Sequence, residues 1–322
     1  MSAEDAAALT ADLATMLPGN PEVRVTGVAS VGANRRTLFL DVIRNEQITK
    51  AVAQIAGFVL DAADVEKEAR LLRAAEKAGV VMPHILADDT ETGTIISEFV
   101  EGESIPRRIL RLVEAQSGLG SRLTSDCGTA LAMIHRIPIQ DFQDLHDLSN
   151  SDRYANEMEQ LLESLSTPHP TFRLGVRWLR RHKLAGTSKP TVIHGDFRLG
   201  NFLASDQGIS AVLDWELAHL GDPMEDLAWL CLRTWRFGAD DLAVGGFGSL
   251  EELRSAYEKA GGEWRDDAFQ WWTVARTLWW GLGLARQAQA YMEGASNSIV
   301  LAASGRRVVE LEYDLLCLMD DA

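Results

Sequence analysis

Residues 192–201 of the chain read Val-Ile-His-Gly-Asp-Phe-Arg-Leu-Gly-Asn, and residues 212–216 read Val-Leu-Asp-Trp-Glu. These two stretches carry three side chains with hard oxygen atoms: Asp196, Asn201 and Asp214. A carboxylate can orient a hydroxyl group and accept its proton. Amide and carboxylate oxygens suit Mg²⁺, which usually takes only one or two protein carboxylates beside phosphate and water. The residue types and their spacing therefore indicate phosphoryl transfer.

Short strands are predicted on both sides of this motif. Residues 190–193 are expected to form a strand that enters the loop, and residues 202–204 and 209–213 form a hairpin after it. The order of strand, loop, hairpin and acid distinguishes the stretch from a chance Asp and Asn five positions apart. Gly195 tolerates backbone angles that a larger residue avoids, and we expect it to shape the loop together with His194.

The motif resembles the active-site sequences of known kinases. The first stretch reads H-G-D-x-x-x-x-N where protein kinases read H-R-D-x-x-x-x-N, and Asp214 stands where their D-F-G aspartate holds magnesium. With the Gly-Asp-Pro-Met-Glu-Asp-Leu-Ala-Trp run at residues 221–229, the block resembles the aminoglycoside phosphotransferase and choline kinase-like superfamily. It looks most like the branch found beside, or fused to, acyl-CoA dehydrogenases. The resemblance is dense over residues 191–229 and weaker over residues 28–135.

The resemblance implies an α+β, two-lobed, protein-kinase-like fold. A small N-terminal lobe would contain an antiparallel sheet plus a helix, and a larger C-terminal lobe would be mostly helical. Residues 1–100 would be the nucleotide-binding lobe, and residues 101–322 the catalytic and acceptor-binding lobe. The pattern of residues 23–29, 37–43 and 48–55 agrees, because it predicts three successive strands.

The resemblance also implies roles for single residues. Asp196 matches the catalytic base position, and Asn201 and Asp214 match the metal positions. Asp226 matches an aspartate that braces the catalytic loop through hydrogen bonds. The co-substrate would be ATP or GTP with Mg²⁺, and the acceptor would be a hydroxyl group of a small molecule. Members of the family act on very different molecules, so the resemblance does not identify the acceptor.

The predicted nucleotide-binding lobe departs from the family pattern at its strand lysine. The matching position falls near Gln54, and Lys50 lies four residues earlier on the same face of the predicted strand. Either Lys50 reaches the phosphates, or the lysine role is lost. Glu68, in the next predicted helix, matches the glutamate that pairs with this lysine. Main-chain groups of Glu98 and Val100 would hold the edge of the adenine ring.

Two glycine-containing stretches have plainer explanations than phosphate binding. The turn at residues 30–35 falls where a kinase folds a loop over the phosphates, but it carries one glycine of that pattern instead of three. The stretch 245–249 lacks the ending of a P-loop. Ser249 and Glu252 instead predict a capping box, and therefore a loop that precedes a capped helix.

Nine tryptophans are many for 322 residues, and three of them recur at near-heptad spacing: Trp272, Trp279 and Trp280. This pattern favours a packed helical core, because large aromatic side chains are usually buried. The alternative is that one or two of them line an acceptor pocket. The histidines have no second ligand at metal spacing, so we expect them to serve packing and hydrogen bonding.

The composition is typical of a compact cytoplasmic enzyme, with 46% hydrophobic and 24% charged residues. The sequence contains no uninterrupted apolar run of eighteen residues, and the N-terminus lacks the pattern of a signal peptide, so we expect no membrane segment. Three widely separated cysteines fit a reducing compartment. A net charge of −16 argues against nucleic acid as a partner. It is compatible with a cationic acceptor, and equally with acidity that only maintains solubility.

Two alternatives to the kinase remain open. One is a nucleotide-binding pseudokinase with little turnover, suggested by Gln54 and by the single glycine in the turn. The other is a regulatory partner module for lipid or acyl-CoA enzymes, suggested by the relatives that the chain resembles. The complete set of Asp196, Asn201 and Asp214 favours the enzyme over both. The sequence does not give the oligomeric state.

Overall fold

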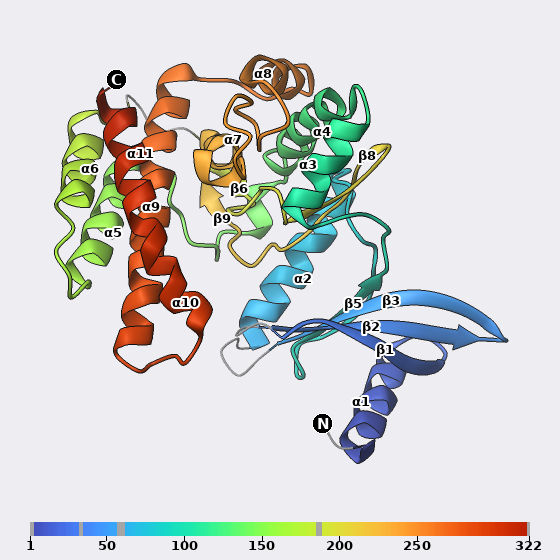
Figure 1. Ribbon diagram of the computed structural model, residues 1–322. Coiled ribbons are helices and arrows are strands. Elements are labelled where there is room, and N and C mark those ends of the chain that lie inside the picture. Colours follow the sequence, from blue (N-terminus) through green and yellow to red (C-terminus); the bar gives the residue numbers. More distant parts are fainter. Residues whose placement is uncertain (1–2, 32–34, 57–61, 185–188, 321–322) are drawn as a thin grey trace. The chain divides into compact units, whose positions relative to one another are not determined.

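The computed structural model describes residues 3–31, 35–56, 62–184 and 189–320. An antiparallel sheet occupies the N-terminal part of the chain, and helices dominate the C-terminal part (Figure 1). The predicted α+β class is therefore confirmed. Among the described residues, none of the helices combines the length and the apolar composition needed to cross a lipid bilayer.

The chain divides into two compact units. The first comprises Met1–Gly102 together with Ser210–Glu216, and the second comprises Glu103–Ile209 together with Leu217–Ala322. The short segment in the first unit is bound there by a main-chain hydrogen bond of 2.8 Å from Val212 N to Val81 O. This segment carries Asp214, whereas the loop with Asp196 and Asn201 belongs to the second unit.

The sheet of the first unit has five antiparallel strands in the order β1-β2-β3-β5-β4: β1 (Glu22–Val31), β2 (Arg35–Arg44), β3 (Gln47–Ala56), β4 (Ile85–Asp89) and β5 (Thr94–Glu98). Alternate residues of a strand point to the same face. In β2 these are Leu38, Leu40 and Val42, all buried, and their partners in β3 include Ala51 and Ala53. Together they form one apolar face of the sheet.

Two helices accompany this sheet. α1 (Ala3–Met16) contributes Leu13 to the apolar cluster that contains the buried residues of β2 and β3. α2 (Ala62–Lys77) contacts β4 and β5. α2 has an apolar stripe, because four residues at helical spacing are buried: Val65, Ala69, Leu72 and Ala75.

The second unit is built around one long helix, α9 (Asp266–Met292), which packs against α5, α6, α7, α10 and α11 (Figure 1). The helices of this unit are α3 (Pro106–Ala115), α4 (Leu119–Ile134), α5 (Ser151–Glu163), α6 (Pro170–Arg181), α7 (Met224–Cys231), α8 (Leu250–Lys259), α9, α10 (Ile299–Ser304) and α11 (Val308–Asp320). Trp271 and Trp272 of α9 are fully buried, as expected for a packed helical core.

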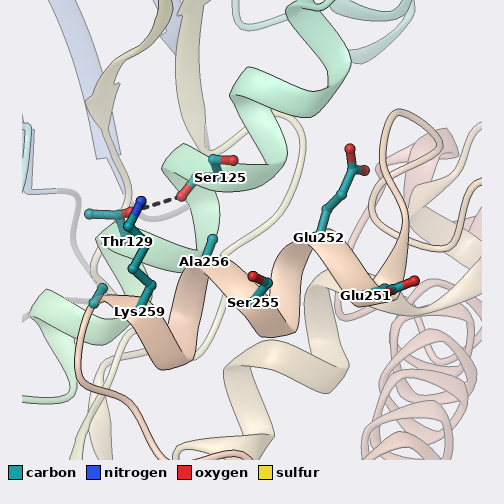
Figure 2. A pocket seen from close by; sticks show the side chains of 8 residues that line it. Ser125, Thr129, Glu251, Glu252, Ser255, Ala256 and Lys259 are labelled. Atoms are coloured by element: carbon teal, nitrogen blue, oxygen red, sulfur yellow. Dashed lines mark hydrogen bonds between the residues drawn. The ribbon is translucent and has the colours of Figure 1, made fainter.

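The predicted capping box at the start of α8 is confirmed. The Ser249 hydroxyl accepts from Glu252 N, and the Glu252 carboxylate accepts from Ser249 N. The glycine-rich stretch before it is a loop, with positive φ at Gly245 and Gly246. α8 packs on α4, and a surface pocket between them is lined from both helices (Figure 2). No residue of the 192–201 or 212–216 stretches lines this pocket.

Short strands frame the loop at residues 194–201. β6 (Thr191–Ile193) enters it and pairs antiparallel with β9 (His219–Gly221). β7 (Phe202–Ser205) leaves it and pairs with β8 (Gly208–Val212). The strand before the loop and the hairpin after it are therefore confirmed, whereas β9 was not predicted. β9 has only three residues, too few to show a period of two in the sequence.

Candidate catalytic site

Glycine sets the path of the loop at its second residue. Gly195 has φ +80°, a left-handed conformation that L-residues with a side chain rarely adopt. A Cβ at this position would overlap the carbonyl group of Leu217. Both the backbone angle and the close approach therefore require glycine, and the prediction that Gly195 shapes the loop is confirmed.

Asp226, at the start of α7, fixes the same end of the loop. Its Oδ2 accepts from His194 N at 2.8 Å, and its Oδ1 accepts from Gly195 N at 2.9 Å. His135 Nε2 lies 3.2 Å from Oδ2. Burial alone would raise the pKa of Asp226, but the interactions with His135 and His194 outweigh it and lower that pKa. The bracing role implied by the resemblance is thus present in the structure.

A buried arginine holds the loop from another direction. Arg276 of α9 is 3% exposed, and its Nη2 donates to the carbonyl oxygen of Gly195 at 2.6 Å. Its Nη1 donates to Glu225 Oε1 at 2.9 Å, and Glu225 Oε2 lies 3.1 Å from His219 Nε2. Buried charges are tolerated when they are paired and hydrogen-bonded. These three side chains tie α9, α7 and β9 to the loop.

The Asp196 carboxylate receives four hydrogen bonds. Oδ1 accepts from Arg198 Nε at 2.9 Å and from Trp229 Nε1 at 2.8 Å. Oδ2 accepts from Arg198 Nη2 at 3.1 Å and from Asn201 Nδ2 at 2.5 Å. The orientation of the carboxylate is therefore fixed by the loop itself and by α7.

Asn201 uses only its amide nitrogen within the loop. Nδ2 donates to the main-chain oxygen of Asp196 at 2.9 Å as well as to the carboxylate. Across the residues that the structure describes, no donor is bonded to Asn201 Oδ1. This geometry leaves an amide oxygen for an external ligand, which is what the predicted metal role requires.

Asp214 has an unusual backbone conformation. Its φ is +62°, which costs a residue with a side chain about 1 kcal/mol, and such residues cluster at functional sites. The side chain is exposed within the first unit. Its convergence with Asn201 on one metal ion stays a prediction. Glu216, two residues later, is also exposed.

The structure places the predicted phosphate-binding residues on β3 and α2. Lys50 and Gln54 lie on the same face of β3, where Lys50 is exposed and its Nζ lies 5.4 Å from the ring centre of Phe99. Gln54 is half-buried opposite Thr37 and thus occupies the position that we expected a lysine to hold. Glu68 on α2 is only 7% exposed, so it is not a solvated surface residue.

The predicted adenine-binding segment follows β5. Glu98 pairs with Ala51 of β3, and its N–H donates to His84 O at 2.9 Å. Phe99 N donates to Lys50 O at 3.2 Å. Within the part of the chain that is described, the Val100 amide donates to no main-chain carbonyl. A main-chain donor is thus available at Val100. The turn predicted at residues 30–35 lies partly outside the described residues.

Sequence reasoning missed the aromatic and cationic residues around Asp196. Trp229 and Trp235 form a buried cluster, against which Trp279 and Trp280 pack. Arg276 lies over the rings of Trp229 and Trp279, with distances of 4.3 and 4.1 Å to the ring centres. Arg198 lies over Trp235 at 4.4 Å. The protein's own arginines therefore lie over one face of each of Trp229, Trp235 and Trp279.

A cavity of about 750 Å³ opens in the second unit. Thr234 and Phe237 on its wall flank Trp235 in the sequence, and Pro106 lies 3.7 Å from the position that a Cβ would take at Gly200. The lining combines apolar and charged side chains, including Ile105, Pro106, Phe237, Arg107, Arg233 and Arg307. Phe237, on the wall of the cavity, has φ +50° and is exposed. The cavity is therefore adjacent to the loop at residues 194–201.

The profile of the phosphotransferase enzyme family (APH) matches residues 29–271 of the chain. Curated relatives include acyl-CoA dehydrogenase family member 10 of Mus musculus, 28% identical over 53% of this chain and 17% of the relative. Acyl-CoA dehydrogenase family member 11 of Homo sapiens is 28% identical over 60% of this chain and 27% of the relative. The chain thus spans less than a third of the length of these relatives.

Solved structures with low sequence identity share the fold. A Ralstonia eutropha protein assigned as an aminoglycoside phosphotransferase superposes with a TM-score of 0.76 at 20% identity, covering 98% of each chain. Macrolide 2'-phosphotransferase MphH of Brachybacterium faecium gives 0.66 at 19% identity, covering 94% of this chain and 97% of that one. ADP-bound aminoglycoside phosphotransferase APH(2'')-Ib gives 0.63 at 17% identity, covering 99% of both chains.

Proposed function

The chain belongs to the phosphotransferase enzyme family, and on this premise we propose that it is a Mg²⁺-dependent small-molecule kinase. It transfers the terminal phosphate of ATP or GTP to a hydroxyl group of its acceptor. The observation that carries the proposal is the fixed carboxylate of Asp196, held on a loop that Asp226 and Arg276 brace from two sides. Such rigid positioning is the main contribution that a protein makes to phosphoryl transfer.

Asp196 acts on the acceptor. Its carboxylate orients the hydroxyl group and takes the proton as the oxygen attacks the terminal phosphorus. The new oxygen–phosphorus bond forms while the bond to the bridging oxygen breaks, and the nucleoside diphosphate leaves. Asn201, through Oδ1, and Asp214, through its carboxylate, are the residues that would hold Mg²⁺. When bound, the ion neutralises charge on the phosphates.

The first unit holds the nucleotide. The main-chain N–H of Val100, together with the Glu98 segment, would bind the adenine edge. Lys50 and Glu68 would contribute to the phosphate end, with Gln54 at the position of the missing lysine. That APH(2'')-Ib, a protein of the same fold, is described as ADP-bound supports a nucleotide co-substrate.

We propose that the cavity beside the catalytic loop receives the acceptor. Its wall carries apolar side chains and both signs of charge, because Arg233 is paired with Asp240 at 3.0 Å and with Asp314 at 2.9 Å. This lining favours an acceptor with both polar and apolar parts over a polycation. Because the curated relatives are acyl-CoA dehydrogenase family members, hydroxyl-bearing acyl-CoA compounds are one class to test.

A phosphorylation screen tests the proposal. The purified protein, Mg²⁺ and ATP or GTP are incubated with aminoglycosides, macrolides, choline and hydroxyacyl-CoA compounds, and products are detected by mass spectrometry. We expect a phosphorylated product from at least one class, absent in Asp196→Ala and retained in Asp206→Ala, an exposed acid in the next turn. Mg-nucleotide binding without any product would favour the pseudokinase, and an active Asp196→Ala variant would remove the base from the mechanism.

A further inference from the structure

The Asp196 carboxylate has no acceptor position left for a substrate. An ionised carboxylate offers about four lone-pair sites, and each of its two oxygens here accepts two hydrogen bonds. The acceptor hydroxyl must donate to this same carboxylate before it can lose its proton. One of the present donors therefore has to leave before the reaction.

Of the three donor side chains, Arg198 is the one that can leave. Trp229 and Asn201 are buried, whereas the Arg198 side chain is 23% exposed. Its departure would free one site on each oxygen, because its Nε and Nη2 bind different oxygens of Asp196. Trp235 supports the guanidinium from one side, at 4.4 Å, and Nη1 donates to Leu199 O at 3.0 Å.

We propose that Arg198 is a further catalytic residue that changes its partner during the reaction. In the unliganded protein it covers Asp196. When nucleotide and acceptor bind, its guanidinium moves from the carboxylate to the oxygens of the terminal phosphate. This inference rests on the proposed kinase function, and it adds a cation from the loop to the phosphate end, where Gln54 stands at the position expected for a lysine.

The guanidinium of Arg198 has only a short distance to move from Asp196 to the terminal phosphate. The attacking oxygen has to lie within hydrogen-bond reach of Asp196, and about 3–3.5 Å from the phosphorus. A guanidinium already bonded to Asp196 is therefore within the reach of one side-chain rotation from the phosphoryl oxygens. Arginine binds carboxylate and phosphate with the same planar fork, so both partners suit it.

The change of partner by Arg198 fits the following sequence of bond changes. The hydroxyl group donates to a vacated site on Asp196, the oxygen–phosphorus bond forms, and the bond to the bridging oxygen breaks. The proton passes to Asp196, and the nucleoside diphosphate leaves. Throughout the reaction, Arg198 stabilises the negative charge on the non-bridging oxygens of the transferred phosphoryl group.

Steady-state kinetics test the catalytic part. We expect Arg198→Ala to lower kcat by about 10²-fold or more while the dissociation constant of Mg-nucleotide changes little. Arg198→Lys keeps the charge but not the fork, so it should restore only part of kcat. Arg254→Ala is the matched control, because Arg254 also pairs with an aspartate, Asp266, and lies over a tryptophan. It should leave kcat unchanged.

Tryptophan fluorescence tests the movement without requiring turnover. The contribution of Trp235 to the emission is the part that disappears in Trp235→Phe. Addition of Mg²⁺ and a non-hydrolysable ATP analogue should change this contribution, because Arg198 leaves the ring of Trp235. The change should be absent in Arg198→Ala, because no guanidinium lies over the ring of Trp235 in that variant. A purely structural arginine would lower the melting temperature but would leave no nucleotide-dependent signal at Trp235.

The outcomes separate this inference from the proposed function. A wild-type protein that forms product, with an Arg198→Ala variant of near-normal kcat or an unchanged Trp235 signal on nucleotide binding, overturns the inference alone. A wild-type protein that forms no product but shows the Trp235 response contradicts the kinase function and supports the movement of Arg198. If Arg198→Ala does not fold, Arg198→Lys takes its place, and a kcat of Arg198→Lys equal to that of the wild-type protein overturns the inference.

Discussion

The indole N–H of Trp229 donates a 2.8 Å hydrogen bond to Oδ1 of Asp196. The two residues lie 33 positions apart, and Trp229 is 1% exposed on α7. The bond comes from a rigid, buried ring, so it fixes the carboxylate more firmly than a flexible side chain would. The face of the same ring lies 4.3 Å from the guanidinium carbon of Arg276, which also holds the Gly195 carbonyl.

Trp229→Phe is expected to lower kcat about tenfold, because it removes one hydrogen bond to a charged group and keeps most of the packing. Its melting temperature should change little compared with that of Trp229→Ala. Trp264→Phe is the matched control, since Trp264 Nε1 donates to Asp266 at 2.9 Å outside the loop. Equal kcat values for both Phe variants would show that the Trp229 bond does not position the base.

Gly195→Ala should destabilise the protein for two reasons: the positive φ of this residue and the overlap of the new Cβ with the Leu217 carbonyl group. Gly118 has a similar φ, +83°, but a Cβ there would meet no atom within 4 Å. We expect Gly118→Ala to cost about 1 kcal/mol and Gly195→Ala on the order of 3 kcal/mol, with loss of activity only in the latter. Urea unfolding of both variants measures the difference, and equal free energies would contradict the close approach to Leu217.

Arg276→Met is expected to destabilise the second unit by about 3–5 kcal/mol, because it leaves Glu225 and the Gly195 carbonyl buried without their partner. Adding Glu225→Gln should recover part of this loss, since the uncompensated charge is then gone. Arg286→Met, at an exposed position of the same helix, is the control. Chemical denaturation of the single and double variants would detect the coupling, and strictly additive effects would argue against it.

The pair of His219 and Glu225 makes stability depend on pH. Burial lowers the pKa of His219, but the charge and hydrogen bond of Glu225 outweigh this, so the pKa is raised overall. A raised pKa in the folded state gives stability that is fully present below the unfolded pKa of about 6.5 and is lost as the pH rises through the folded pKa.

His219→Gln should therefore cost most stability below about pH 6.5, and the difference from wild type should shrink as the pH rises above that value. Denaturation curves between mildly acidic and mildly alkaline pH measure this difference. His182→Gln, at an exposed position, is the control variant. A difference that grows with rising pH would mean that the sign of the shift is wrong.

Much of the fold could be predicted from local pattern. The strands of the first unit alternate apolar residues with a period of two, and α2 carries its apolar stripe at helical spacing. The capping box of Ser249 and Glu252 was predictable because both residues contribute to the same turn. The path of the loop could be predicted at Gly195, because glycine readily adopts the left-handed backbone conformation that the loop needs there.

The residues that hold Asp196 and its loop in place could not be predicted in the same way. Arg276 meets Gly195 across 81 positions, and no periodicity in the sequence links an arginine in a tryptophan-rich helix to a distant carbonyl. The only signal was a charged residue within an apolar helix, which must be paired once it is buried. The ion pair of Arg198 with Asp196 is local, but its role depends on Trp235 and Trp229, which only the fold brings to the loop.

The measurement that tests the central claim most directly is a crystal structure with Mg²⁺ and a non-hydrolysable ATP analogue. We predict that Asn201 Oδ1 and the Asp214 carboxylate both coordinate the ion at about 2.0–2.1 Å, with Asp196 facing the terminal phosphate. The account would be contradicted by a magnesium ion that lacks Asn201 or Asp214 as a ligand. A terminal phosphate bound away from Asp196 would also contradict it.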